Sequence, residues 1–274
     1  MTSTSDVLSI QREGAIATLW LDRPEKRNAL SRALWQAIPG ALGELAADEE
    51  VRAVILAGRG PSFCVGLDLK ETGAGADLGD APSQAVANLR QLDTTTRFQK
   101  AVSSLAECPL PVIAVVHGHC LGGGVDLITA CDVRLAAADA SFGIRETRIG
   151  IVADVGTLQR LPRIVSAGQV AELAYTGKDI DAARAEKIGL VNDVYPDFDA
   201  AYAAAREMAQ EIAANPPLAV RGTKFVLQRN EDLTTEQSLL LNGLYTLTTS
   251  LQSNDLREAM KAFLEKRPPN FTGN

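Results

Sequence analysis

The chain between residues 111 and 131 reads Pro-Val-Ile-Ala-Val-Val-His-Gly-His-Cys-Leu-Gly-Gly-Gly-Val-Asp-Leu-Ile-Thr-Ala-Cys, and this stretch decides the fold. The apolar, β-branched run over 111–116 predicts a buried strand. The three glycines at 122–124 form a turn that leads into an expected helix over 125–131. The next strand is expected at 132–136. A strand, a tight turn and a helix in this order are typical of an α/β core with mostly parallel strands.

The same alternation continues toward the N-terminus. Residues 7–21 predict two strands that turn at Gly14, and a further buried strand is expected over 51–57. Ser31 is the expected N-cap of a helix whose apolar residues recur at helical spacing, namely Leu34, Trp35, Ile38, Leu42 and Leu45. Residues 72–88 are rich in Gly, Ala and Asp and predict a surface loop, followed by a helix over 89–106.

The pattern changes after about residue 198. Helices are expected over 199–214, 217–229 and 234–264, with no strand between them. The sequence therefore divides into a core over 1–198, which would carry the active site, and a helical C-terminal region over 199–274.

Length and composition exclude several classes of protein. The chain has 274 residues, of which 46% are hydrophobic and 22% charged, as in an ordinary globular protein. The formal net charge of -7 argues against a broad surface for nucleic acid or an anionic membrane. No apolar run approaches the ~18–20 residues of a membrane span. The first residues resemble no signal peptide, so we expect a cytoplasmic protein with neither a nucleic-acid nor a membrane partner.

The cysteines and histidines raise the question of a metal site. His117 and His119 lie beside Cys120, and Cys131 follows. Zinc ligands usually have wider spacings, and no two cysteines form a Cys-x-x-Cys pair. We expect no metal, free thiols in a reducing compartment, and a strand end followed by a turn at Gly118.

The triple glycine can do chemistry in more than one way. A turn from strand to helix exposes backbone N–H groups at the positive end of the helix dipole. Such groups bind dinucleotide phosphates or stabilise a developing oxyanion, or the turn is simply a close packing turn. The spacing Gly118-x-x-x-Gly122-Gly123-Gly124 differs from the dinucleotide pattern Gly-x-Gly-x-x-Gly. A second such turn, over 63–70, has Gly66 placed so that the N–H of Leu67 can point into a cavity.

Three carboxylates lie near these turns in the sequence. Asp126 falls in the first turn of the expected helix, where the dipole favours its anion. Glu146 and Asp154 lie in the largely apolar segment 142–156. A buried carboxylate near others has a raised pKa and carries a proton at neutral pH. Alternatively, Asp154 caps a helix that starts at Val155, and Glu146 pairs with a neighbouring arginine, Arg145 or Arg148.

Together these stretches resemble the enoyl-CoA hydratase/isomerase (crotonase) superfamily. The likeness runs from residues 21–30 to residues 262–267, and its most specific pieces are residues 63–69 and 117–127. It implies an α/β fold, a crotonase-like spiral of β-β-α turns with a helical C-terminal oligomerisation region. It also implies that the backbone N–H groups of Leu67 and Gly123 form an oxyanion hole.

Within this superfamily the carboxylates resemble those of the Δ3,5-Δ2,4-dienoyl-CoA isomerases. Enoyl-CoA hydratases carry two glutamates, of which the first position is Asp126 here and the second is Glu146. Asp154 lies in Val-Ala-Asp-Val-Gly-Thr-Leu-Gln-Arg-Leu-Pro, residues 152–162, where a hydratase usually has glycine. The resemblance implies that Glu146 removes a proton from C2 of a 3,5-dienoyl-CoA, that Asp154 protonates C6, and that Asp126 stays ionised and holds the pair.

The resemblance also implies a binding surface and an assembly. Substrate contacts would come from residues 65–69, that is Val65, Gly66, Leu67, Asp68 and Leu69, and from Gly123. Val65 departs from the family, where alanine is common. Basic residues, namely Lys26, Arg27, Lys266 and Arg267, would contact CoA phosphates or form a solvated basic surface. No metal or redox cofactor is expected, because CoA is part of the substrate and its thioester supplies the activation. The assembly expected is a homotrimer or homohexamer.

Three rival functions fit the same resemblance. An enoyl-CoA hydratase would add water to a 2-enoyl-CoA, but Asp126 and Asp154 count against it. A Δ3-Δ2-enoyl-CoA isomerase needs one base and would leave Asp154 idle. A non-catalytic acyl-CoA-binding subunit would keep the fold without using the three carboxylates.

Overall fold

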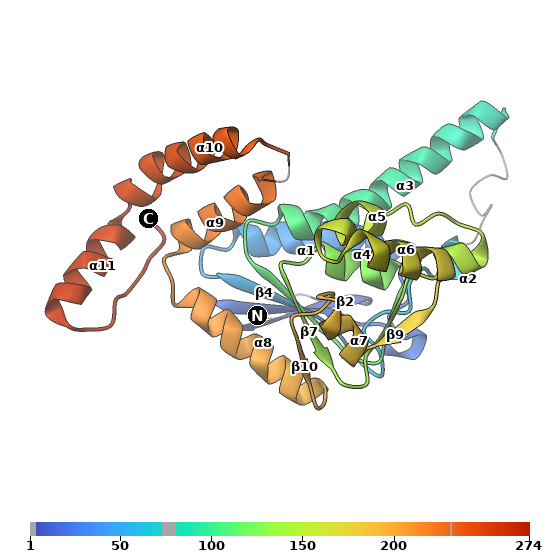
Figure 1. Ribbon diagram of the computed structural model, residues 1–274, viewed down its shortest axis with the longest axis horizontal. Helices are drawn as coiled ribbons and strands as arrows, with labels where there is room; N and C mark the ends of the chain where they lie inside the picture. The colour runs from blue at the N-terminus through green and yellow to red at the C-terminus, as the bar shows by residue number, and fades with distance from the viewer. Residues whose placement is uncertain (1–3, 73–80, 231) are drawn as a thin grey trace.

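The computed structural model describes residues 4–72, 81–230 and 232–274 (Figure 1). The strands are β1 (Thr4–Ser5), β2 (Leu8–Glu13), β3 (Ile16–Leu21), β4 (Ala53–Gly58), β5 (Val112–Val116), β6 (His119–Leu121), β7 (Val133–Ala137), β8 (Ser141–Gly143), β9 (Asp179–Asp181) and β10 (Asp193–Tyr195). The α-helices are α1 (Arg32–Ala47), α2 (Leu69–Thr72), α3 (Gln84–Glu107), α4 (Gly123–Thr129), α5 (Thr157–Arg160), α6 (Ala167–Thr176), α7 (Ala182–Lys187), α8 (Phe198–Ala213), α9 (Pro217–Arg229), α10 (Thr235–Thr248) and α11 (Asn254–Glu265). Short 3-10 helices are η1 (Pro24–Lys26), η2 (Glu146–Ile149), η3 (Leu161–Arg163) and η4 (Ser250–Gln252).

The large sheet has the order β1-β2-β3-β4-β5-β7-β10. Its first three strands pair antiparallel, and every pairing from β3 to β10 is parallel. All residues of β3, β4 and β5 are buried, as expected for parallel strands covered on both faces. The predicted α/β core with mostly parallel strands is confirmed.

A second sheet, β6-β8-β9, explains the spiral. The chain passes from β5 in the large sheet to β6 in the small one and then through α4. It returns through β7 to the large sheet and β8 to the small one, where β6 and β8 pair in parallel. The predicted β-β-α turns are therefore present.

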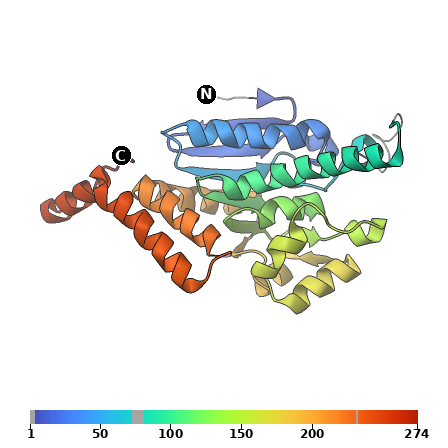
Figure 2. The ribbon, with the colours of Figure 1, turned by 90° about the horizontal axis from the view of Figure 1, so that it is seen from above.

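Helices cover both faces of the large sheet (Figures 1 and 2). On one face α1 and α3 pack against each other and close the main hydrophobic core. On the other face α8 lies against β4, β5 and β7. It buries Ala201, Ala205 and Ala209, whose spacing of four residues makes a narrow stripe that lets the helix approach the sheet closely.

Two predicted helices have different bounds in the structure. The helix expected at 89–106 begins at Gln84, because Ser83 caps it by accepting a hydrogen bond from the Val86 N–H at 3.3 Å; residues 84–88 of the expected loop are therefore helical. The single helix expected over 234–264 was wrong. Ser253 starts a new helix by accepting a hydrogen bond from the Leu256 N–H at 3.1 Å, so α10, η4 and α11 replace it.

The C-terminal helices extend away from the sheet (Figure 2). Leucines on α10 are exposed, namely Leu239, Leu240, Leu244 and Leu247, as are Met260, Phe263 and Leu264 on α11. Exposed apolar side chains that gather on neighbouring helices often mark a protein–protein interface. No helix in residues 4–72, 81–230 and 232–274 is long and apolar enough to cross a membrane.

Lys224 anchors α9, the helix that follows α8, to the core. Its buried ammonium donates to the Leu110 carbonyl at 2.9 Å and to Asp132 at 2.7 Å. We expect Lys224→Met to lower the free energy of unfolding by about 1–3 kcal/mol, because the carbonyl and the carboxylate lose a charged partner. Urea unfolding of this variant beside Lys187→Met, an exposed lysine, measures the effect. Equal stability of the two variants would contradict the anchoring role.

Candidate active site

The turn after β4 presents a backbone donor. Leu30 forms a parallel bridge with Leu67. Its N–H donates to the Gly66 carbonyl at 2.7 Å, and its carbonyl accepts from the Asp68 N–H at 3.1 Å. In such a bridge the N–H of Leu67 itself points away from Leu30. No described residue accepts a hydrogen bond from this N–H.

The turn before α4 supplies a second donor close by. A Cβ added to Gly66, whose φ is +88°, would lie 2.8 Å from the Leu121 carbonyl oxygen and 3.5 Å from the Gly123 nitrogen. The turn after β4 and the turn before α4 therefore lie in contact at Gly66. Gly123 is the first residue of α4, and within the described chain its N–H has no acceptor either. A Cβ on Gly123 would come within 2.6 Å of Leu30 Cδ1, so a side chain at this position would have to displace that buried methyl group.

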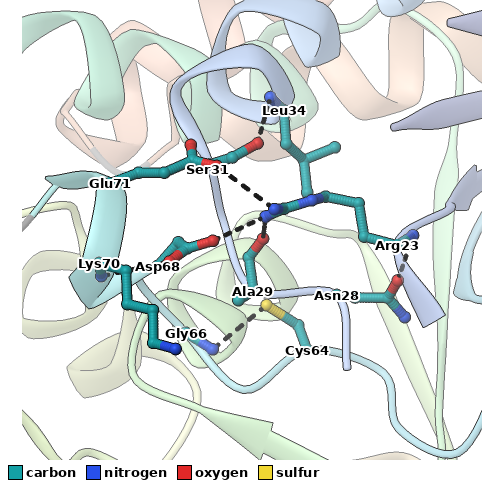
Figure 3. Close-up of polar contacts among 10 residues, drawn as sticks. All are labelled: Arg23, Asn28, Ala29, Ser31, Leu34, Cys64, Gly66, Asp68, Lys70 and Glu71. Carbon is teal, nitrogen blue, oxygen red and sulfur yellow. Dashed lines mark hydrogen bonds and ion pairs between the residues drawn. The ribbon is translucent and has the colours of Figure 1, made fainter. Parts of the chain in front are cut away.

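An arginine that the sequence analysis did not single out holds the first turn in place (Figure 3). The buried Arg23 guanidinium donates to the Ala29 carbonyl at 2.5 Å and to Asp68 at 3.1 Å, and it lies 3.4 Å from Glu71. Asn28 accepts from the Arg23 N–H at 2.8 Å. Asp68, predicted to contact substrate, thus bonds to Arg23 and fixes the loop. The sequence signal for this role of Arg23 was its place in segment 22–30, which the sequence analysis used only as part of the resemblance to the superfamily.

Glu146 lies against the second turn. A Cβ on Gly122 would be 3.2 Å from Glu146 Oε1, and the buried Oε2 has no hydrogen-bond partner. Burial raises the Glu146 pKa to about 7, and the neighbouring Asp126 and Asp154 charges add to the shift. The alternative pairing with a neighbouring arginine was wrong, because Arg145 donates to Asp179 at 2.8 Å and Arg148 packs against Gly177.

Asp126 is buried in the first turn of α4. Its Oδ1 accepts from the Thr157 N–H at 2.6 Å and from the Thr157 hydroxyl at 2.7 Å. Burial nevertheless raises the Asp126 pKa to about 6, against the lowering effect of these two bonds. The helix dipole was expected to favour the Asp126 anion, but this effect does not outweigh the cost of removing the carboxylate from water. Asp126 therefore ties α4 to the segment that carries Asp154.

Asp154 stands at the open side of this group. Its side chain is exposed, and its backbone carbonyl accepts from Gln99 of α3 at 2.6 Å. The predicted alternative, a helix cap, was wrong, since α5 begins at Thr157 with Gly156 as its N-cap. Asp154 also lines a cavity of about 390 Å³. Its charge acts on Glu146 and on Asp126, so the structure brings the three predicted carboxylates together.

The remaining predicted residues fall into two groups. Val65 and Leu69 flank the first turn, and exposed Arg27 adjoins it through its carbonyl, which accepts from the Val65 N–H at 3.2 Å. Lys266 is exposed at the C-terminal end of α11, whereas α2, next to the first turn, lies at the opposite end of the molecule in Figure 1. One copy of the chain does not bring Lys266 to the site.

The contacts of His117 and the burial of the cysteines indicate that these residues support the fold. His117 Nε2 lies 2.8 Å from the Gly60 carbonyl oxygen and its ring packs on Phe198. All four cysteines are buried and unpaired. Within the described ranges, no three His, Cys, Asp or Glu side chains are grouped to hold a metal ion.

Comparisons with known proteins identify the family of the chain. The family model described as Enoyl-CoA hydratase/isomerase matches residues 11–274. The mitochondrial Delta(3,5)-Delta(2,4)-dienoyl-CoA isomerase of Dictyostelium discoideum is 42% identical over 94% of this chain and 88% of its own length. The peroxisomal isomerase of that name from Arabidopsis thaliana is 37% identical over 98% and 96%. The crystal structure of an enoyl-CoA hydratase from Bacillus anthracis superposes with a TM-score of 0.89 at 32% identity, over 98% of this chain and all of that one.

Proposed function

The chain belongs to the enoyl-CoA hydratase/isomerase family, and on that premise we propose that it isomerises 3,5-dienoyl-CoA to 2,4-dienoyl-CoA. One observation carries the proposal. A half-buried glutamate lies against one of two turns whose backbone donors have no described acceptor, and the charge of an exposed aspartate acts on that glutamate. The isomerases among the relatives, at 37–42% identity, support the same reaction.

The proposed reaction starts at the thioester carbonyl. Hydrogen bonds from the Leu67 and Gly123 N–H groups stabilise the negative charge that develops on its oxygen, which makes the C2 proton more acidic. Glu146 as carboxylate takes that proton. The electron pair is delocalised along the diene as far as C6.

Protonation at the far end completes the reaction. Asp154 takes up a proton from solvent and delivers it to C6, and the double bonds come to rest at C2 and C4. Glu146 then releases the C2 proton to solvent, which completes the cycle. Asp126 touches no reacting atom in this scheme; its hydrogen bonds to Thr157 position the segment that carries Asp154.

The C-terminal region completes the proposal. The exposed leucines of α10 and the apolar side chains of α11 support a homotrimer or homohexamer. In such an assembly Lys266 would reach the CoA of a neighbouring copy, while Arg27 serves its own site.

We expect the pH dependence of kcat/KM to report the charge of Glu146. The base must be ionised, and removal of the C2 proton is the step that limits kcat/KM in this scheme, so kcat/KM should fall as the pH drops through about 7. Asp126→Asn keeps an acceptor for Thr157 but removes the charge that raises the Glu146 pKa. The acid limb should therefore move to lower pH in this variant. A limb that stays in place or moves to higher pH would contradict the coupling.

The proposed activity is tested by product analysis. The protein is incubated separately with a 3,5-dienoyl-CoA and with a 2-enoyl-CoA, and the products are identified by mass spectrometry and ultraviolet absorbance. Isomerisation leaves the mass unchanged and adds a long-wavelength band from the conjugated dienoyl thioester. Addition of one water to the 2-enoyl-CoA, with the dienoyl-CoA untouched, would make the protein a hydratase. Binding of both thioesters without turnover would make it a non-catalytic acyl-CoA-binding subunit.

A further inference from the structure

The segment that carries Asp154 is tied to α3 at both of its ends. The Gln99 side chain donates to the Asp154 carbonyl at 2.6 Å, and Arg160, the last residue of α5, donates to the Ser103 hydroxyl at 2.8 Å. Gln99 and Ser103 lie four residues apart on α3, so they share one face of that helix. Of the two donors only Arg160 is charged, so this tie has an electrostatic effect as well as a structural one.

The Arg160 guanidinium lies beside the start of α5, where Asp126 is bound. A Cβ on Gly156, whose φ is +136°, would collide with Arg160 Nη1, so the guanidinium fills the space beside this glycine. Thr157, the next residue, donates its N–H and its hydroxyl to Asp126. The guanidinium and the Asp126 carboxylate thus contact adjacent residues, and each charge stabilises the other.

The surroundings of Asp126 otherwise disfavour its negative charge. Burial raises the Asp126 pKa most, and the Asp154 charge raises it further, whereas the two bonds from Thr157 and the Arg160 charge lower it. The titratable and charged groups that interact with the Asp126–Arg160 pair come from several other segments, namely Glu146, Asp154, the thiols of Cys64 and Cys120, Glu107 of α3 and Arg163 of η3. Removal of the Arg160 charge would therefore raise the Asp126 pKa.

We propose that Arg160 is a positioning residue for the isomerisation, which fixes the segment of Asp154 on α3 and keeps Asp126 ionised beside Glu146. This role rests on the proposed function, because it serves the two carboxylates that move protons there. An ionised Asp126 disfavours the ionisation of Glu146, so the glutamate is a stronger base toward the C2 proton. Arg160 itself touches no reacting atom in this scheme.

The test measures the pH dependence of isomerisation by Arg160→Gln. Loss of the cation raises the Asp126 pKa, so more Asp126 is neutral near pH 7 and the Glu146 pKa falls. The acid limb of kcat/KM should therefore lie at lower pH than in the wild type. The shorter glutamine also loses the tie to Ser103, which should lower kcat by up to about 10²-fold, the cost of misplacing a reacting group by about 1 Å.

Two further variants separate the charge of Arg160 from its shape. In Asp126→Asn the charge on which Arg160 acts is already gone, so adding Arg160→Gln should leave the acid limb where Asp126→Asn alone places it. Arg160→Lys keeps the charge but not the forked donors, so it should keep the wild-type limb with a lower kcat. The matched control Arg206→Gln, on α8 across the sheet, should keep both the limb and kcat.

Other results would overturn the inference. An Arg160→Gln limb that coincides with that of the wild type, or a further shift in the double variant, would exclude an action through Asp126. A shifted limb in Arg160→Lys would exclude it too, and this variant decides the question if thermal unfolding shows that Arg160→Gln is misfolded. A wild-type kcat in Arg160→Lys and Arg160→Gln would exclude the positioning of Asp154. If the wild type does not conjugate a 3,5-dienoyl-CoA, the proposed function itself fails.

Discussion

Replacing Glu146 by glutamine is expected to lower kcat for the isomerisation by about 10²–10⁴-fold, the usual contribution of a positioned acid or base. The amide keeps the size of the side chain but cannot accept the C2 proton. Glu146 Oε2 is buried without a partner and the carboxyl lies against Gly122, so this carboxylate is not committed to a structural contact and is available as the base of the proposed reaction. Initial rates from the long-wavelength absorbance of the product measure the loss.

The control for this variant is Glu186→Gln, which makes the same chemical change at an exposed position of α7. It should keep the wild-type rate. The KM of Glu146→Gln should change far less than its kcat, since the oxyanion donors belong to the backbone of other segments. Full activity in Glu146→Gln would mean that a group other than Glu146 takes the C2 proton.

Replacing Asp154 by asparagine is expected to lower isomerisation by a similar factor, about 10²–10⁴-fold. Asparagine has no proton to give to C6, although the Gln99 contact to the backbone of residue 154 remains. The measurement is again the rate of conjugation. Asp139→Asn, in an exposed turn between β7 and β8, is the matched control.

A second readout separates a chemical role of Asp154 from a structural one. Thermal unfolding of Asp154→Asn should match the wild type, because the side chain is exposed and α5 is capped without it. A variant that loses activity together with stability would point to misfolding. Full activity in a stable variant would remove Asp154 from the reaction.

Much of the fold could be predicted because its signals are local. The buried strands are continuous apolar runs, and Ser31 caps the predicted helix through a hydrogen bond from the Leu34 N–H at 3.2 Å. The break between α10 and α11 has a weaker local signal. Thr249 and Ser253 can occupy a helix interior or a helix end, so periodicity alone extends one helix through them.

The sequence predicts the members of the proposed site but not the contacts that hold them in place. The glycine spacing and the three carboxylates are visible in the sequence, and the family resemblance gave them roles. The Arg23–Asp68 pair and the Asp126–Thr157 bonds join residues 45 and 31 positions apart. Contacts over such separations depend on how the strands are ordered, and no local pattern encodes them. The opposite environments of Glu146 and Asp154 are likewise a result of packing.

The most direct test of the two-carboxylate proton shift is to run the isomerisation in D₂O and locate deuterium in the product by NMR. Asp154 is exposed, so its acidic proton exchanges with solvent before it is delivered. The account predicts a 2,4-dienoyl-CoA with deuterium at C6. A 2,5-dienoyl-CoA with deuterium at C4, or a 2,4-dienoyl-CoA with no deuterium at C6, would contradict protonation by Asp154 at the far end of the diene.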